Sequence, residues 1–506
     1  MNTVRLNGLD LTIAEIVAVA RERVVVELDP AARAGIRASA DLVAEVAWGP
    51  DAVYGVNTGF GDLAQIRIAP PDLRRLQQNL LRSHAAGVGP DLPADVVRAL
   101  LLLRANTLAS GYSGVRLETI GALIDLLNAD VIPCIPMHGS VGASGDLAPL
   151  AHAALVLIGE GEAWYRQTRL PGRDALAAAG LRPIELAPKE GVALINGTQV
   201  MTAIGALALH DAELLAVTAD IVGALSAEAL RATDRSWDEG LNRLRRHAGQ
   251  QVVAANLRAL MGESPNVAGH RSGDPRVQDP YSIRCMPQVH GASRDALSYV
   301  RTTLQAETNS VTDNPLVFAA RRAIVSGGNF HGQPVAIALD LGTIAVAELA
   351  DIAEARVDRL TNGHTSGLPA FLSRHPGTDS GLMIAQYTAA ALVVENRLRS
   401  APASIESIST SAGMEDHVSM GVHAAHKFAA VVRTTADVLA IEALCAAQGL
   451  DLLGAKTNDL LRGAYQAIRA IIPTLDRDRP LAADIARASE AVRSGVLAKA
   501  VGVLVR

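Results

Sequence analysis

The feature that most restricts the fold of this chain is a series of long apolar segments with helical periodicity, beginning at about Leu194. In residues 346–357, apolar side chains recur at i, i+3, i+4 and i+7, the spacing of one helix face. Long helices with such faces pack together as a bundle. We expect the polar stretch Arg231–Arg276 to be a surface connection. The predicted long helices are Thr198–Leu230, Ser293–Glu307, Pro334–Leu360, Gly381–Arg399 and Val418–Ala447.

The first part of the chain mixes shorter elements. Val24–Leu28 has the character of a strand, whereas Tyr54–Gly61 is a turn-rich loop without a period. Only 3% of the residues are aromatic, which fits packed helices better than a β-sandwich. We therefore expect a mainly α fold, with a mixed N-terminal domain (1–193) and a helical-bundle domain (194–506). Helical patterns in the first domain cover Ala31–Ala47, Asp72–His84, Val97–Ser110 and Leu117–Ala129.

The net charge and the cysteine content limit which partners the protein is expected to bind and which cellular compartment is expected. A net charge of -6 offers no electrostatic basis for binding nucleic acid or an acidic membrane. The three cysteines are far apart and odd in number, which fits a reducing cytoplasm. The first residues show no signal peptide. The apolar stretch Pro334–Ala350 contains Asp340 and Glu348, so we interpret it as a buried helix and expect no membrane span.

One short run, Gly139–Leu150, carries the most distinctive chemistry. At its centre lie Ala143, Ser144 and Gly145, three small residues that can bend the backbone back on itself. The Gly145 amide nitrogen could attack the Ala143 carbonyl carbon, and loss of two water molecules would leave a methylidene-imidazolone. One of these waters would carry away the Ser144 hydroxyl, and a Cβ at position 145 would block the approach. The tripeptide alone is also compatible with a structural glycine-rich loop.

Three glycine-bearing turns lead directly into predicted helices: Ser144–Asp146, Asn196–Thr198 and Gly327–Gly332. Asp146 and Thr198 are candidate N-caps, because their side chains can accept hydrogen bonds from the first helical amides. If these helix starts converge, their positive ends surround one site and stabilise anionic groups there. Spacing alone does not distinguish such a site from three ordinary capped helices.

Eight segments, in a fixed order between residues 54 and 420, carry a resemblance to a known family. They are Tyr54–Gly61, Ser83–Gly89, Gly139–Leu150, Ile195–Thr198, Gln278–Cys285, Thr312–Pro315, Gly328–Pro334 and Glu415–Met420. Together they resemble the motifs of the aromatic amino acid ammonia-lyase family, and within it those of the histidine ammonia-lyases. Several motifs in family order are far more specific than any single one.

The resemblance implies a fold of the fumarase/aspartase-like ammonia-lyase type, and a homotetramer whose active sites are shared between subunits. It implies that Ala143, Ser144 and Gly145 form the methylidene-imidazolone, so that neither an external organic cofactor nor a metal is needed. A covalent bond between such an electrophile and the substrate amine makes that nitrogen easier to expel. The implied partner is a small amino acid substrate.

The matching motifs also imply roles for single residues. Tyr54 matches the tyrosine that removes the β-proton. The usual pKa of a tyrosine is about 10, so helix ends or cations must lower this pKa if Tyr54 is to act as a general base near neutral pH. Arg284 matches the residue that holds the substrate carboxylate in a bidentate pair. Tyr281 and Asn196 match polar groups beside the prosthetic group and the carboxylate, Gln278 matches a nearby hydrogen-bonding residue, and Phe330 matches the aromatic that packs on the imidazolone.

Two positions set the expected substrate. His84 and Glu415, the latter counted among the catalytic residues, follow the histidine lyases, whereas phenylalanine and tyrosine lyases usually have leucine at the first position and no carboxylate at the second. A buried imidazole ring needs a partner for each nitrogen, and a site that supplies both rejects analogues without them. The implied reaction is elimination of ammonia from L-histidine to give urocanate. Gly413–Met414 departs from the usual Asn-Gln, which would allow a shifted substrate preference.

Other interpretations of these residues are either open or unsupported. A tyrosine or phenylalanine ammonia-lyase, a 2,3-aminomutase with the same prosthetic group, and a non-catalytic helical scaffold are the alternatives. Gly142–Asp146 lacks the final glycine of a hydrolase nucleophile elbow. The four lysines lie in no motif for pyridoxal phosphate, and the spacing of His417, His423 and His426 matches no zinc signature.

Overall fold

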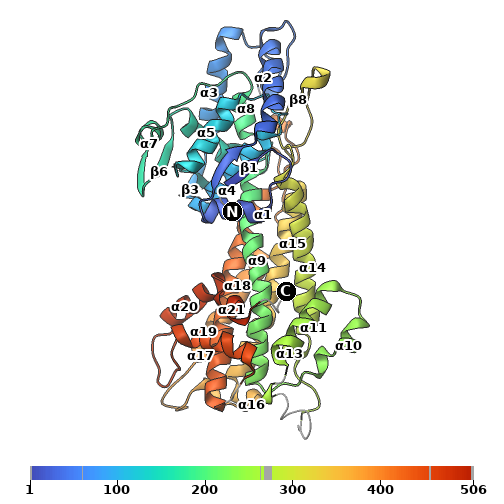
Figure 1. Ribbon diagram of the computed structural model, residues 1–506, viewed down its shortest axis with the longest axis vertical. Helices are drawn as coiled ribbons and strands as arrows, with labels where there is room; N and C mark the ends of the chain where they lie inside the picture. The colour runs from blue at the N-terminus through green and yellow to red at the C-terminus, as the bar shows by residue number, and fades with distance from the viewer. Residues whose placement is uncertain (1–2, 60, 263, 267–275, 455–456, 503–506) are drawn as a thin grey trace. The chain divides into compact units, whose positions relative to one another are not determined.

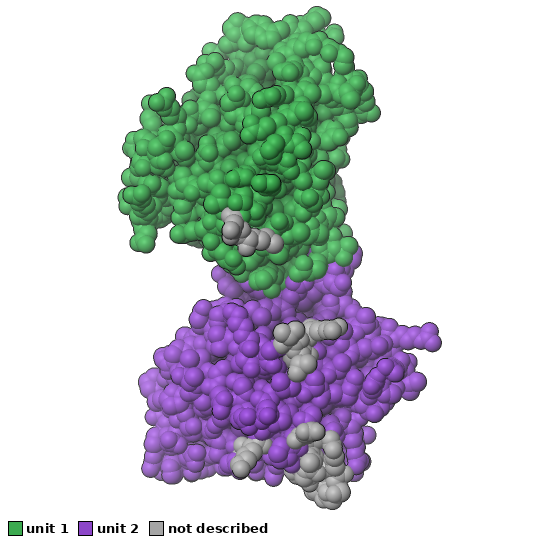
Figure 2. Space-filling model, viewed as in Figure 1, with its two compact units in different colours: residues 1–210, 301–339, 402–426 green, residues 211–300, 340–401, 427–506 purple. Residues whose placement is uncertain are grey.

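A computed structural model describes residues 3–59, 61–262, 264–266, 276–454 and 457–502. The fold is mainly α-helical, as the sequence predicts (Figure 1). The chain forms two compact units, each assembled from several stretches (Figure 2). Unit 1 comprises residues 1–210, 301–339 and 402–426, and unit 2 comprises 211–300, 340–401 and 427–506. The sequence-based division into 1–193 and 194–506 stays a prediction.

Unit 1 contains all the strands among the described residues, arranged in small sheets. They are β1 (Thr3–Leu6), β2 (Val25–Leu28), β3 (Val88–Asp91), β4 (Ile132–Pro133), β5 (Pro136–His138), β6 (Glu162–Tyr165), β7 (Thr168–Pro171), β8 (Leu316–Phe318) and β9 (Ala323–Val325). β1 pairs with β2 in parallel, with Thr3 opposite Val25. The other pairs are antiparallel: β3 with β5, β8 with β9, and β6 with both β4 and β7.

The helices of unit 1 include a largely buried one, α4 (Ala94–Ala109). They are α1 (Ile13–Arg21), α2 (Arg33–Trp48), α3 (Leu73–His84), α4 (Ala94–Ala109), α5 (Leu117–Asn128), α6 (Leu147–Leu157), α7 (Gly172–Ala178) and α8 (Glu190–Ile195). α4 is buried from Val97 to Ala109 and packs against α1 and α5. A helix that is apolar nearly all round lies in a core, which explains its weak amphipathic pattern.

Unit 2 is helical throughout its described elements. Its own helices are α10 (Glu239–Arg243), α11 (Ala248–Met261), α13 (Tyr281–Arg284), α16 (Gly363–Ser366), α17 (Met383–Arg399), α19 (Asp459–Ile471), α20 (Ala482–Arg493) and α21 (Val496–Val501). Four long helices contribute residues to both units: α9 (Gln199–Ala229), α14 (Met286–Thr308), α15 (Gln333–Thr361) and α18 (Gly421–Leu453).

All five predicted long helices are confirmed, with ends that shift by a few residues. The largest difference is in α14, which begins at Met286 instead of Ser293, because Pro287 is tolerated in a first helical turn. Within the described residues, α9 is long and apolar enough to cross a membrane by length and composition. Most of its apolar window is buried inside the protein, as in a core helix.

The expectation of a surface connection over Arg231–Arg276 is wrong for much of that segment. α11 lies there and buries Val253, Leu257 and Leu260, which recur with helical spacing. Trp237 is fully buried just before α10. The charged residues that precede α11 and the glutamines and asparagine within it conceal this short apolar pattern in the sequence. Residues 263 and 267–275 of the segment lie outside the described residues.

Candidate active site

The tripeptide 143–145 lies in a tight, unusual backbone turn. Ser144 has φ +52° and Gly145 has φ +79°, both in the left-handed region that L side chains rarely adopt. Gly145 forms isolated β-bridges with Gly142 and Gly197. A Cβ at position 145 would lie 2.2 Å from the Gly197 carbonyl oxygen, so only glycine fits. The backbone therefore holds the three residues in a compact loop, as their proposed cyclisation requires.

Asp146 anchors this loop to the start of α9. Its buried carboxylate accepts hydrogen bonds from the amides of Val200 (2.8 Å) and Met201 (3.0 Å) and from the Ser140 hydroxyl (3.1 Å). The prediction that Asp146 caps its own helix is wrong in this respect, because no described amide of α6 donates to its side chain. Thr198 precedes α9, and its hydroxyl donates to Glu307. Burial raises the pKa of Asp146 to about 7, although its three donors oppose this shift.

Asp146→Asn should change how the stability of the protein depends on pH. The Asp146 carboxyl of the folded protein stays protonated up to about pH 7, whereas in the unfolded chain it ionises near pH 3.8. Between these values unfolding releases a proton, so this carboxyl makes the free energy of unfolding fall by about 1.4 kcal/mol per pH unit. Thermal unfolding between about pH 4.5 and pH 6.5 should show the variant gaining stability relative to the wild type as pH rises. A difference that stays constant over this range contradicts the raised pKa.

The starts of four helices meet at this loop. α6 and α9 begin on either side of the Gly145–Gly197 bridge. Gly332, just before α15, and Gly421, the first residue of α18, both pack on Met201 of α9, with ideal Cβ positions 2.4 and 2.3 Å from its sulfur. The convergence that spacing alone left open is therefore present, and positive helix ends face the tripeptide region.

Glu415 is the side chain that contacts the tripeptide directly. The Ser144 hydroxyl donates to its Oε1 at 3.2 Å, and the Thr410 hydroxyl donates to its Oε2 at 2.8 Å. Thr410 is a site residue that sequence reasoning missed, since a lone threonine outside the family motifs gave no signal. Gly413 has φ +86°, a region that asparagine also tolerates, and Met414 is largely exposed. The turn that presents Glu415 is therefore one that an asparagine at position 413 could also adopt.

Tyr54 and His84 both interact electrostatically with Glu415. Burial, with a further contribution from Glu415, raises the pKa of Tyr54, although a backbone hydrogen bond at Gly61 opposes this. The expectation that the pKa of Tyr54 is lowered is therefore wrong for the groups of this chain. Burial lowers the pKa of His84, against the opposing effects of the Leu80 backbone and Glu415. His84 Nδ1 also lies 3.0 Å from the Ser83 hydroxyl. Ser144, Tyr54, His84 and Glu415 thus form one cluster.

Asn196 lies next to this cluster through its neighbour Gly197. Its side chain is buried, its Nδ2 donates to the Asn314 carbonyl at 3.3 Å, and its Oδ1 has no partner among the described residues. Beneath it, buried Arg104 donates to the Asn196 carbonyl and to Gln199, each at 2.9 Å. Burial lowers the pKa of Arg104 to about 10. Arg104 also escaped sequence reasoning, although a charge within the apolar run of α4 is a usable signal for a buried structural role.

Phe330 lies in the turn before α15 and is half-buried. The next residue ties this turn to the segment that follows Glu415: His331 Nε2 donates to the His417 carbonyl at 3.1 Å, and the two imidazole rings stack with centroids 5.8 Å apart. No group of three or more His, Cys, Asp or Glu side chains that could hold a metal occurs among the described residues.

The remaining three predicted residues belong to unit 2. Gln278 is exposed just before α13, and Tyr281 and Arg284 are the first and last residues of that helix. The Arg284 guanidinium carbon lies over the Tyr281 ring, 4.5 Å from its centroid. Unit 1 thus contains most of the predicted residues, whereas Gln278, Tyr281 and Arg284 belong to unit 2.

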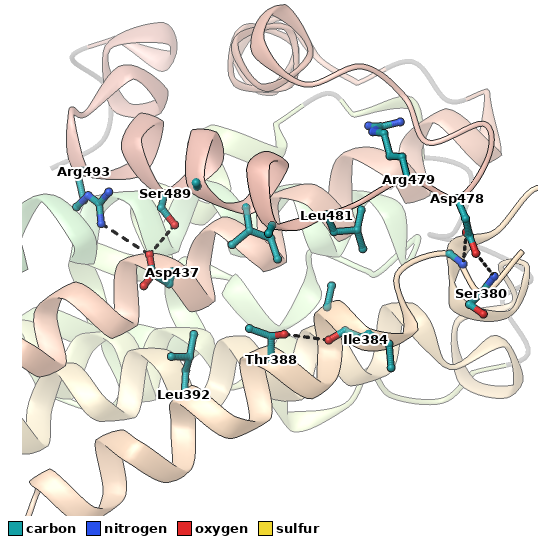
Figure 3. A pocket seen from close by; sticks show the side chains of 15 residues that line it. Ser380, Ile384, Thr388, Leu392, Asp437, Asp478, Arg479, Leu481, Ser489 and Arg493 are labelled. Atoms are coloured by element: carbon teal, nitrogen blue, oxygen red, sulfur yellow. Dashed lines mark hydrogen bonds and ion pairs between the residues drawn. The ribbon is translucent and has the colours of Figure 1, made fainter.

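A cavity of about 890 Å³ in unit 2 contains none of the predicted site residues (Figure 3). It lies between α17 and α20, with apolar Ile384, Leu392 and Leu481 along it. Asp478 on its rim accepts from the Ser380 and Gly381 amides, and Asp437 from Ser489. These polar groups are used in local structure, so chemistry is not expected here.

Comparisons with known proteins define the class. Residues 11–470 match the aromatic amino acid lyase family, and the chain belongs to this family. It is 53% identical to histidine ammonia-lyase of Stigmatella aurantiaca, with 99% of each chain covered. The structure of histidine ammonia-lyase from Trypanosoma cruzi is similar, with a TM-score of 0.93, 43% identity and coverage of 100% of this chain and 96% of that one. Tyrosine aminomutase from Streptomyces globisporus has a TM-score of 0.94 and 38% identity over all of both chains.

Proposed function

We propose that this protein eliminates ammonia from L-histidine to give urocanate. The observation that carries the proposal is the cluster in which Ser144 donates to Glu415 while Tyr54 and His84 interact with the same carboxylate. It combines the residue of the self-formed electrophile, a candidate base and two partners for an imidazole ring. The similarity to histidine ammonia-lyases over nearly the whole chain supports this proposal.

We propose that Ala143, Ser144 and Gly145 form a methylidene-imidazolone without an added reagent. The left-handed turn and the close packing of Gly145 on Gly197 fit the cyclised tripeptide, because they leave no room for a Cβ. This group would supply an electrophile for the amino nitrogen of the substrate. The converging helix starts would stabilise negative charge that develops beside it.

The other residues are assigned by what their side chains can do. Tyr54 accepts the β-proton on its phenolate oxygen. His84 and Glu415 pair with the two imidazole nitrogens of the substrate, which a buried ring requires. Arg284 binds the substrate carboxylate through its planar fork. Tyr281 and Asn196 bind near the reacting centre, Gln278 adds a hydrogen bond, and Phe330 covers the imidazolone.

We propose that the sites are completed in a homotetramer. α17 exposes Ile384, Tyr387, Val394 and Leu398, whose spacing places them on one helix face. An apolar face of this kind is typical of an interface with another chain. Tyr281 is 70% exposed, as expected of a residue that serves a site shared between subunits. The small amino acid remains the proposed substrate, with no nucleic acid or membrane partner and a cytoplasmic location.

Separate incubations with L-histidine, L-tyrosine and L-phenylalanine test this function. Ultraviolet spectra report conjugated products, ammonia is measured in the same samples, and chiral chromatography detects β-amino acids. Urocanate and ammonia from histidine alone support the proposal. Ammonia with a cinnamate-type spectrum would reassign the substrate, a β-amino acid with little ammonia would indicate an aminomutase, and no product from any of the three would contradict the proposal.

His84→Leu should weaken the preference for histidine. The variant leaves one imidazole nitrogen of the substrate unpaired, which costs about 1–3 kcal/mol and lowers kcat/KM for histidine about 10- to 100-fold. Activity towards tyrosine or phenylalanine should fall less or rise. His84→Gln keeps a hydrogen-bonding group and should retain more histidine activity than His84→Leu. Equal losses of kcat/KM for all three substrates would argue that His84 does not recognise the imidazole ring of histidine.

A further inference from the structure

We infer that Arg356, on α15, is a positioning residue that holds the Tyr281–Arg284 turn in place. The inference rests on the proposed function, which gives Tyr281 and Arg284 their roles. α13 has only four residues, and a single turn of helix is too short to be stable by itself. Arg356 Nη1 donates to the carbonyl oxygen of Ser282, inside this turn, at 3.2 Å. The guanidinium thus reaches the backbone between the two proposed site residues.

Arg356 is itself fixed on its other side. Its side chain and that of Glu442, on α18, are both fully buried. The pair is bidentate, with Nε to Oε1 at 2.5 Å and Nη2 to Oε2 at 2.9 Å. The Ser226 hydroxyl of α9 donates to the same Oε1 at 2.6 Å. Because a guanidinium is planar, the two bonds to Glu442 determine where Nη1 points.

A glycine on α9, Gly223, leaves the space that the Arg356 side chain occupies. An ideal Cβ at Gly223 of α9 would lie 2.6 Å from the Met286 sulfur and 3.5 Å from the Arg356 guanidinium carbon. Glycine in a helix interior costs about 1 kcal/mol relative to alanine, so its presence here reflects the space that Met286 and Arg356 occupy. Met286 begins α14, directly after the site turn and Cys285.

Stability alone is a weak explanation for this buried pair. Desolvation of two charges commonly cancels their attraction, and apolar residues of similar volume are often as stable. The guanidinium does something that an apolar side chain could not, since it donates a hydrogen bond to Ser282. Arg284 in turn lies over the Tyr281 ring, so a displaced backbone would move both side chains together. Misplacement of about 1 Å in a site can cost about 100-fold in rate.

The test separates positioning from folding by removing both charges at once. Arg356→Met combined with Glu442→Met leaves no unpaired buried charge, so the thermal midpoint should remain close to that of the wild type. We expect kcat/KM for histidine to fall about 10- to 100-fold, with a raised KM because Arg284 holds the carboxylate. Arg356→Lys keeps the charge but not the fork, and should show the same kinetic defect. Ser226→Ala loses one hydrogen bond to Glu442 but leaves Ser282 bound, and should keep the wild-type KM.

A second readout does not depend on activity. Amide hydrogen exchange of residues 283–285 should become faster in the double variant, whereas exchange in α11 should not change. Faster exchange with reduced activity supports the inference. If exchange in this turn is unchanged, or if the double variant keeps wild-type kinetics, Arg356 does not position it. A wild-type protein that is inactive on histidine, with faster exchange in the variant, would overturn the proposed function but not the contact.

Discussion

Ser144→Ala is expected to abolish almost all release of ammonia while the protein remains folded. Without the Ser144 hydroxyl, the tripeptide cannot lose the second water and the methylene electrophile cannot form. Loss of covalent catalysis should lower kcat by at least about 1,000-fold, which corresponds to more than about 4 kcal/mol in the activation barrier. The variant retains the Thr410 bond to Glu415, so the carboxylate should keep its orientation. Ammonia release under substrate saturation measures the effect.

Ser310→Ala is the matched control for this substitution. Ser310 also belongs to unit 1, and its hydroxyl donates to the Ala306 carbonyl at 2.8 Å, at the end of α14. The control should retain wild-type activity and a similar thermal midpoint. A Ser144→Ala protein that keeps full activity would mean that the electrophile does not come from this residue.

Tyr54→Phe should lower kcat/KM by about 100- to 10,000-fold, the range that a positioned general base contributes. Burial and Glu415 raise the pKa of Tyr54, so little phenolate is present at neutral pH. Because the deprotonated form is the base, wild-type activity should increase with pH from neutral into the alkaline range. Tyr54→Phe should lose this increase along with most of the rate. Profiles of kcat/KM against pH for both proteins test the prediction.

Tyr112→Phe provides the comparison, since Tyr112 packs on Phe318 in unit 1 with ring centroids 5.6 Å apart. It should show the wild-type rate and pH profile. A wild-type profile that is flat from neutral to alkaline pH would indicate that another subunit lowers the pKa of Tyr54. A Tyr54→Phe variant with undiminished kcat/KM would remove Tyr54 from the proposed chemistry.

The long helices could be predicted because their apolar faces repeat over many turns, and two of them, α9 and α15, begin after glycine-bearing turns that the sequence marks clearly. Short helices are less predictable. α11 was missed because its apolar residues extend over only a few turns and alternate with glutamine, asparagine and small residues. Helix ends also differ from the prediction, as at Met286, where Pro287 is accommodated in the first turn of the helix.

The candidate site could be found in part for a different reason: its residue types are dictated by chemistry. Ser144, Tyr54 and Glu415 stand in distinctive motifs, and the structure joins them in one cluster. Their supporting contacts could not be predicted: Thr410 lies close to Glu415 in sequence but outside any motif. Arg356 reaches the Ser282 carbonyl from a distant part of the chain. Asp146 looked like the cap of α6, yet tertiary packing turns its carboxylate to α9. The direction of the Tyr54 pKa shift likewise depends on burial that sequence does not reveal.

The most direct test of this account is the mass of the wild-type peptide that contains Ala143, Ser144 and Gly145. After proteolysis of the purified protein, mass spectrometry should find this peptide lighter than its sequence by two water molecules. The corresponding peptide of Ser144→Ala should not show the loss of two water molecules. An unmodified wild-type peptide from a fully active preparation would contradict the self-formed electrophile on which the proposed reaction depends.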